Sequence, residues 1–166
     1  MIEEKVHRKD FGTIGELTVA RHLLGQGYSV FSEYGDNSKV DLIALVDNVP
    51  IKIQVKSCNS SKGKVSLFLK KNAKGYEYRY NTKDCDIFAL YVYDLDRIAF
   101  ISSKEALEYR SVISFRINEA SVNHNQYEPR LFDDYADIKE ALRDYTPLTL
   151  TNNVEGEEIV QTTTTQ

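Results

Sequence analysis

Apolar residues recur at three- and four-residue steps near the start of the chain, and the segments that follow alternate between apolar and polar positions. Over 9–27 the helical period is carried by Phe11, Ile14, Leu17, Ala20, Leu23 and Leu24. This spacing predicts an amphipathic helix. Alternating or continuously apolar segments predict strands at 28–34, 40–46, 50–58, 65–69, 86–93 and 97–102. A tight turn at Asp47-Asn48 joins two of these strands, so we expect a β-hairpin over 40–58.

Weaker patterns describe the second half of the chain. Ser102 or Ser103 predicts the start of a short helix that runs through Tyr109, and the alternation at 112–117 is typical of an edge strand. A late helix is predicted over 133–145, with its apolar face formed by Tyr135, Ile138, Leu142 and Tyr145.

The order of these elements predicts the fold class and the domain boundaries. One helix, several strands and further helices indicate an α/β domain with a mixed central β-sheet flanked by helices. The polar segment around His124 is expected to be a surface loop. Residues 146–166 are rich in Thr and Glu and have little to bury. We therefore expect a single domain over 1–145 and a flexible C-terminal tail over 146–166.

Composition narrows the class of protein. The chain has no run of about 18 apolar residues and no basic-then-apolar leader, which predicts a cytoplasmic protein without a membrane partner. Cys58 and Cys85 are far apart and belong to no Cys/His cluster. This pattern favours reduced structural thiols over a zinc site or a disulfide.

The net charge of −4 conceals a basic segment over 52–83, where nine Lys and Arg residues stand against one Glu and give +8. Such a segment is suited to phosphate contacts, although a solvated lysine-rich loop is the ordinary alternative. We expect nucleic-acid contacts from Lys62, Lys64, Lys70, Lys71, Lys74, Arg79 and Asn81. The tyrosines at 76, 78 and 80 more often form a packed strand face than a base-stacking platform.

Several candidate catalytic and metal-binding residues lie on the predicted hairpin. Asp41 precedes its first strand, and the period of two places Gln54 and Lys56 on one face of its second strand. The Asp41 carboxylate, the Gln54 amide oxygen and the Val55 carbonyl are hard ligands of the kind Mg²⁺ prefers. Lys56 would orient a water or stabilise charge in phosphodiester hydrolysis. Each of these residues also has an ordinary reading as a turn or solvated strand position.

Glu16 lies at the edge of the apolar stripe of the first helix and is the fourth candidate. It could hold a metal-bound water or a second ion from the helix side. Four such residues in this order are harder to explain as unrelated surface positions than any one of them alone.

These residues carry a resemblance to a known family. The relevant segment is GTIGELTVARHLLGQGYSVFSEYGDNSKVDLIALVDNVPIKIQVKS, followed by DIFALYVYDLDRIAFIS. Over residues 9–117 the chain resembles the PD-(D/E)xK nucleases, and more narrowly the bacterial group I intron-encoded homing endonucleases, whose last motif is QxK. Val40 stands where the family name expects a proline.

The resemblance implies a restriction-endonuclease-like core and a Mg²⁺-dependent, site-specific endonuclease for double-stranded DNA, with Mn²⁺ as a substitute ion. It implies Glu16, Asp41, Gln54 and Lys56 as site residues. Because Gln54 replaces an acid and removes one unit of ligand charge, we expect weaker metal binding or a single tightly held ion.

Two alternatives remain open at this stage. One is a junction-resolving or repair nuclease of the same fold. The other is a DNA-binding module that has lost hydrolysis, with Gln54 as the trace of that loss. One chain provides one hydrolytic site, so a double-strand break predicts a homodimer or homotetramer.

Overall fold

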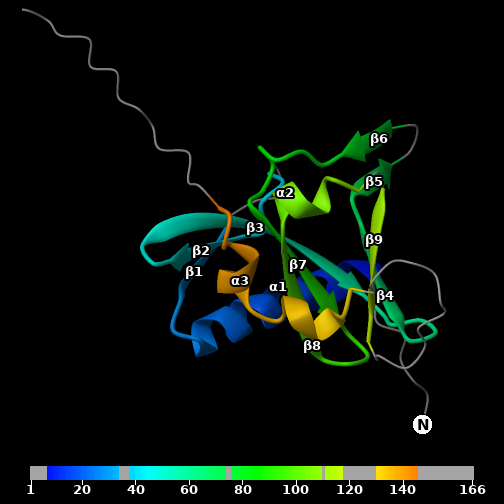
Figure 1. The fold of residues 1–166 in the computed structure, drawn as a ribbon, viewed down its shortest axis with the longest axis horizontal. Helices are drawn as coiled ribbons and strands as arrows, with labels where there is room; N and C mark the ends of the chain where they lie inside the picture. Colours follow the sequence, from blue (N-terminus) through cyan, green and yellow to red (C-terminus); the bar gives the residue numbers. More distant parts are fainter. Residues whose placement is uncertain (1–6, 34–37, 74–75, 110, 118–129, 146–166) are drawn as a thin grey trace, which may run out of the picture.

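The computed structural model describes residues 7–33, 38–73, 76–109, 111–117 and 130–145, and within them a mixed sheet forms the centre of the molecule (Figure 1). Its strand order is β1-β2-β3-β7-β8, with β3 and β7 parallel and the other neighbours antiparallel. The strands are β1 (Ser29–Ser32), β2 (Leu42–Val46), β3 (Val49–Cys58), β7 (Ile87–Val92) and β8 (Arg97–Ser102). The predicted α/β class with a mixed sheet is therefore confirmed.

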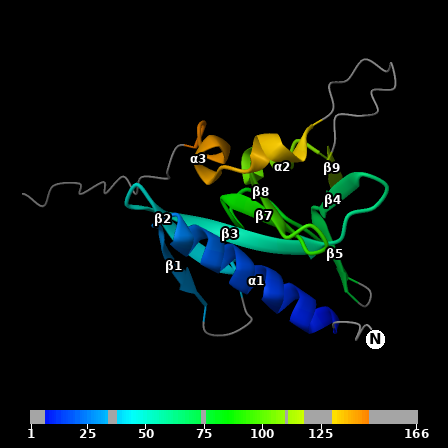
Figure 2. The ribbon, with the colours of Figure 1, turned by 90° about the horizontal axis from the view of Figure 1, so that it is seen from below.

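Helix α1 (Arg8–Gly25) runs along one side of this sheet (Figure 2). Val19 and Leu23 of α1 are buried together with Ile53 and Val55 of β3. The helix predicted over 9–27 is thus confirmed, but Leu17 and Leu24 of its predicted apolar face are exposed and do not pack against the sheet.

The two faces of the sheet bury separate hydrophobic clusters. Strand β7 is buried along its whole length and divides its side chains by the period of two. Ile87, Ala89 and Tyr91 join the cluster beneath α1, whereas Phe88 and Leu90 join a second cluster on the opposite face. A strand buried on both faces explains why 86–93 is continuously apolar in the sequence.

Two small two-stranded sheets accompany the central one. Strand β4 (Lys64–Phe68) pairs with β9 (Val112–Arg116), and β5 (Lys70–Ala73) pairs with β6 (Tyr76–Arg79). The strand predicted at 112–117 is present, but it pairs with β4 and does not extend the central sheet. The short helix α2 (Ser103–Ala106) begins where expected, with the Ser102 hydroxyl accepting the Glu105 N–H at 3.1 Å, but it ends at Ala106 and does not continue through Tyr109 as predicted.

The late helix predicted over 133–145 is wrong. This segment forms a short 3₁₀ helix, η1 (Phe132–Tyr135), and a separate helix, α3 (Ile138–Ala141). Asp137 is extended between them, and its carboxylate accepts the Lys139 N–H at 2.8 Å. An N-cap in this position starts a new helix, because the Asp side chain competes with the helical backbone bonds.

Two other expectations, the loop around His124 and the tail over 146–166, lie outside the described residues, so the proposed domain boundary near 145 stays a prediction. Within the part of the chain that is described, no helix combines the length and apolar character that crossing a membrane requires.

The hairpin turn fixes how β2 and β3 align. Asp47 and Asn48 have positive φ angles of 50° and 65°, as the two central residues of a type I′ turn require. The resulting register pairs Leu42 with Ile53, and the Asp41 N–H donates to the Ile53 carbonyl at 2.9 Å. The predicted hairpin is therefore confirmed, and it brings Asp41 beside Gln54.

Gly15 allows α1 to approach β3 closely. A Cβ atom at Gly15 would lie 2.0 Å from the Ser57 hydroxyl oxygen and 3.3 Å from the Ser57 Cβ. That hydroxyl is buried and has no hydrogen-bond partner among the described residues. The helix next to Glu16 thus depends on a small residue at this point.

We expect Gly15→Ala to lower the free energy of unfolding by about 1–3 kcal/mol, because the added methyl group overpacks the contact with Ser57. The double variant Gly15→Ala/Ser57→Ala should recover most of that loss. Urea unfolding monitored by circular dichroism measures both.

Gly12→Ala is the matched control, since nothing lies within 4 Å of a Cβ at that position. It should leave stability unchanged or raise it by up to about 1 kcal/mol through helix propensity. Equal stability changes for Gly12→Ala and Gly15→Ala would contradict the close contact.

Candidate active site

The hairpin joins three of the candidate residues directly. Oδ2 of Asp41 accepts the Val55 N–H at 2.6 Å and also accepts Nε2 of Gln54. The same Gln54 nitrogen donates to the Val55 carbonyl at 3.2 Å. Asp41 is half-buried, and Gln54 is only 6% exposed. The carboxylate, the amide and the carbonyl therefore converge on one point at the start of β2.

This donor set fits a divalent cation. Two oxygens, one from Asp41 and one from Val55, face the amide nitrogen of Gln54. A half-turn of the Gln54 amide would present its oxygen instead, and the three groups would then offer three oxygens to one cation. Within the described residues, no three His, Cys, Asp or Glu side chains gather in an arrangement that could hold a metal ion.

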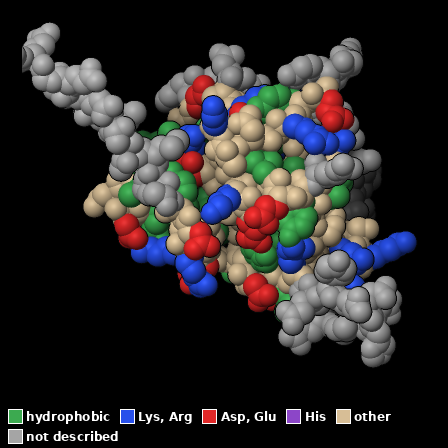
Figure 3. All heavy atoms as spheres, turned by 45° about the horizontal axis from the view of Figure 1, so that its top comes forward, with side chains coloured by type: hydrophobic (Ala, Val, Ile, Leu, Met, Phe, Trp, Pro, Cys, Tyr) green, Lys and Arg blue, Asp and Glu red, His purple; other side chains and the backbone are tan. Residues whose placement is uncertain are grey.

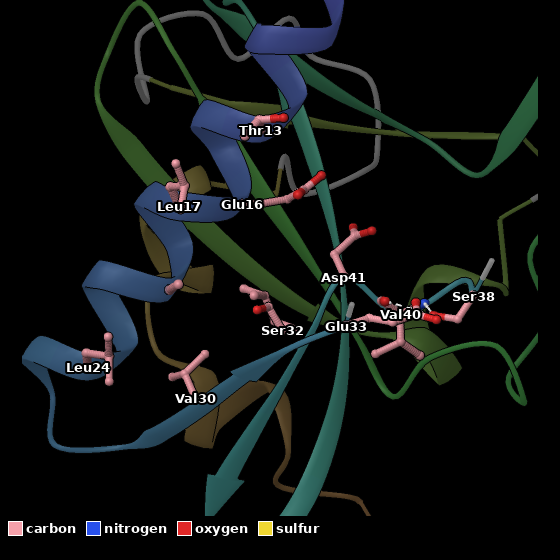
Figure 4. Close-up of a pocket in the computed structure, with 12 residues that line it drawn as sticks. Thr13, Glu16, Leu17, Leu24, Val30, Ser32, Glu33, Ser38, Val40 and Asp41 are labelled. Carbon is pink, nitrogen blue, oxygen red and sulfur yellow. Dashed lines mark hydrogen bonds between the residues drawn. The ribbon is translucent and has the colours of Figure 1, made fainter. Parts of the chain in front are cut away.

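Glu16 reaches the site from the helix side. It lines a cavity of about 370 Å³ together with Asp41, while Leu17, Leu24 and Val30 form the apolar part of the wall. Figure 4 shows Glu16 extending from α1 and Asp41 extending from the start of β2 into the same opening. Asp41 is thus shared between the cavity and the Gln54 contact.

Lys56 and Gln54 lie on the same face of β3, as the period of two predicts. In the β3–β7 register Gln54 is opposite Phe88 and Lys56 is opposite Leu90, which both belong to the cluster on the face away from α1. Lys56 is two residues beyond Gln54 on this strand. Its ammonium group therefore lies on the same side of the sheet as the Gln54 side chain.

Lys56 makes a contact that its sequence pattern did not predict. Its Nζ donates to the Tyr80 hydroxyl at 2.5 Å and lies 4.6 Å from the centre of the Tyr80 ring. Burial, and secondarily the charge of Asp41, raise the pKa of Tyr80 well above its ordinary value. The phenol is neutral at physiological pH. The alternating tyrosines were the available signal, but they indicated only a packed face.

The basic residues of 52–83 are spread over several elements. Lys62 and Lys64 are exposed at and beside β4. Lys70 pairs with Glu77 at 3.2 Å, and Arg79 lies 3.8 Å from the same carboxylate. One acid thus offsets part of the positive charge that the sequence concentrates here.

The structure describes only some of the remaining candidates for nucleic-acid contact. Asn81 is exposed, but its side-chain oxygen accepts the Lys83 N–H at 3.0 Å within the turn after β6. The Lys71 side chain and Lys74 lie outside the described part. On the face shown in Figure 3, acidic and basic side chains are interspersed and form no single basic patch.

Comparison with known proteins identifies a matching family and a similar solved structure. A family model described as PD-(D/E)XK endonuclease matches residues 6–137. Among solved structures, a bacterial homing endonuclease, I-Ssp6803I, is 23% identical to the chain with a TM-score of 0.67. The match covers 84% of this chain and 95% of that one, and it shows a shared fold. No curated protein matches the chain by sequence.

Both cysteines should react slowly in the folded protein. Burial raises the pKa of Cys58 to about 11 and that of Cys85 to about 12. The reactive thiolate is therefore scarce at pH 8. We expect labelling by a disulfide reagent at pH 8 to be about 100-fold slower in the native protein than in urea.

The same shifts predict a stability change in alkali. The unfolded thiols ionise near 9.0 while the folded ones stay protonated, so the free energy of unfolding should fall as the pH rises from 9 to about 11. Rapid native labelling of either thiol would contradict this description.

Proposed function

The chain belongs to the PD-(D/E)XK endonuclease family, and from that premise we propose that it is a Mg²⁺-dependent endonuclease that cuts double-stranded DNA at specific sites. The observation that carries this proposal is the convergence of Asp41, Gln54 and the Val55 carbonyl one residue before Lys56. An oxygen-rich metal position beside a lysine is the arrangement that phosphodiester hydrolysis needs.

Nucleases of this family typically use divalent metal ions. In our proposal Asp41, Gln54 and Val55 hold Mg²⁺ through their oxygens, Glu16 contributes from the helix side, and Mn²⁺ substitutes. The bound ion would supply a Lewis acid for the phosphoryl oxygen and lower the pKa of a water. Because Gln54 adds no charge, we propose one tightly held ion in each chain.

The protein groups have separate roles around the scissile phosphate. The Val55 N–H fixes one oxygen of Asp41, so the carboxylate keeps a single orientation. The Lys56 ammonium stabilises the negative charge that builds up on the phosphoryl group. Glu16, across the cavity, accepts a hydrogen bond from the attacking water and orients it.

We assign DNA contacts chiefly to the outward face of the β4–β9 ribbon. On that face Lys64 is paired with Arg116, Ser66 with Ser114 and Phe68 with Val112. Cations and hydroxyls on a two-stranded ribbon suit phosphates and base edges in a groove. Further contacts are proposed from Lys62, Lys70, Lys71, Lys74, Arg79 and Asn81.

The homing type of substrate is the finer part of the proposal. It is supported by the fold shared with I-Ssp6803I, which is described as a bacterial homing endonuclease, and by the QxK form of the motif. A double-strand break needs two sites, so we propose a homodimer or homotetramer. Faster cleavage of a four-way junction than of any long duplex would instead identify a junction-resolving nuclease.

Removing the carboxylate or the ammonium group should separate cleavage from binding. We expect Asp41→Asn and Lys56→Met to lower the rate of Mg²⁺-dependent cleavage of a duplex library at least about 100-fold, because the first removes a charged metal ligand and the second removes the positive charge beside the phosphate. Their affinity for the same DNA in Ca²⁺ should change by less than about 3-fold, as measured by fluorescence anisotropy.

Lys52→Met is the matched control on the same strand. Lys52 contacts the Lys83 carbonyl and Asp86 and has no proposed role in cleavage. It should cut at the wild-type rate. Wild-type cleavage by Asp41→Asn or Lys56→Met would remove that residue from the mechanism, and a wild-type protein that binds DNA and cuts nothing would indicate an inactive binding module.

Gln54→Glu should tighten metal binding. The substitution restores one unit of ligand charge at the same position, so the affinity for Mn²⁺ is expected to rise about 10-fold with cleavage retained. Isothermal titration calorimetry measures the affinity and the number of ions. Two equally tight ions in the wild type, or weaker binding in the variant, would contradict the proposed ligand set.

A further inference from the structure

Tyr80 contacts the Lys56 side chain directly. The Lys56 ammonium donates to the Tyr80 hydroxyl at 2.5 Å and also lies over the Tyr80 ring. A lysine side chain has a flexible four-carbon stem and three donors, so its position is set by the groups it contacts. A hydroxyl and a ring face from one residue restrict that position from two directions.

Tyr80 itself is held rigidly. It is 6% exposed, and its ring packs edge-on against the rings of Phe88 and Tyr78. The distances between ring centroids are 5.3 Å to Phe88 and 5.6 Å to Tyr78. Its N–H donates to the Leu69 carbonyl at 3.3 Å. Phe88 is the register partner of Gln54 on the neighbouring strand. The group that contacts Lys56 is therefore built into the same part of the core that carries Gln54.

The Tyr78 hydroxyl in the same segment makes a different kind of contact. Its hydroxyl donates to both carboxylate oxygens of Asp84 at 2.6 Å, a contact closed within six residues of chain. The Tyr80 hydroxyl instead reaches 24 residues back along the chain to the strand of the site. The two tyrosines are alike in type and neighbourhood and differ in what the hydroxyl contacts.

The chemistry of the partner also favours a functional contact. A protonated phenol accepts the Lys56 hydrogen bond and adds no negative charge beside the ammonium group. Burial and the charge of Asp41 keep Tyr80 in the protonated form. Lys56 therefore gains an acceptor without losing electrostatic strength toward a phosphate.

We propose that the Tyr80 hydroxyl positions the Lys56 ammonium for phosphodiester cleavage, which makes Tyr80 a positioning residue of the site. This inference rests on the proposed function, because it assigns Lys56 its role in the reaction. It also extends the site beyond the hairpin to the segment that follows β6.

The test compares Tyr80→Phe with Tyr78→Phe, each of which removes one hydroxyl and keeps the ring. With saturating DNA and Mg²⁺, Tyr80→Phe should lower the single-turnover cleavage rate about 10- to 100-fold, the range for losing a hydrogen bond to a charged group. Its affinity for DNA in Ca²⁺ should stay within about 2-fold. Tyr78→Phe should cleave at the wild-type rate even if its melting temperature falls.

A second readout does not depend on cleavage. Lysine side-chain NMR spectra report the motion of the Lys56 ammonium group, whose signal is assigned by its loss in Lys56→Met. This motion should be restricted in the wild type and free in Tyr80→Phe. An unchanged Lys56 signal, or wild-type cleavage by Tyr80→Phe, would overturn the proposal. If the wild type cuts no DNA the proposed function fails, and the NMR comparison still decides whether Tyr80 positions Lys56.

Discussion

The candidate site depends on the register of the β2–β3 hairpin. Asp47 and Asn48 adopt the left-handed conformations that set this register, and Leu42 then pairs with Ile53. A shift by one residue would turn every side chain of a strand to its other face. Gln54 and Lys56 would then point beneath α1, and the contact with Asp41 would be lost. The turn is therefore as important to the candidate site as the side chains that form it.

Around this hairpin, other elements complete the site by close packing. Gly15 lets α1 approach Ser57 of β3, and the next residue, Glu16, enters the cavity that Asp41 lines. On the opposite face the segment after β6 places Tyr80 against Lys56. Three elements that are distant in sequence thus meet around Asp41 and Lys56: the hairpin carries these two residues, α1 adds Glu16, and the segment after β6 adds Tyr80.

Local patterns predicted the helix, the hairpin and the shared face of Gln54 and Lys56, because periods of 3.6 and 2 and the turn chemistry act over a few residues. The break at Asp137 escaped prediction because one cap overrode an apolar period. The Tyr80 contact escaped because it depends on the chain path through two small sheets. Summed charge could not show that Lys70 and Arg79 share Glu77.

The most direct test of this account is the position of a bound ion in crystals grown with Mn²⁺, read from its anomalous scattering. We predict one strong peak within coordination distance of the Asp41 carboxylate, the Val55 carbonyl and the amide oxygen of a turned Gln54 side chain. A strong peak elsewhere on the chain, with the Gln54 nitrogen still facing Asp41, would contradict the proposed metal position.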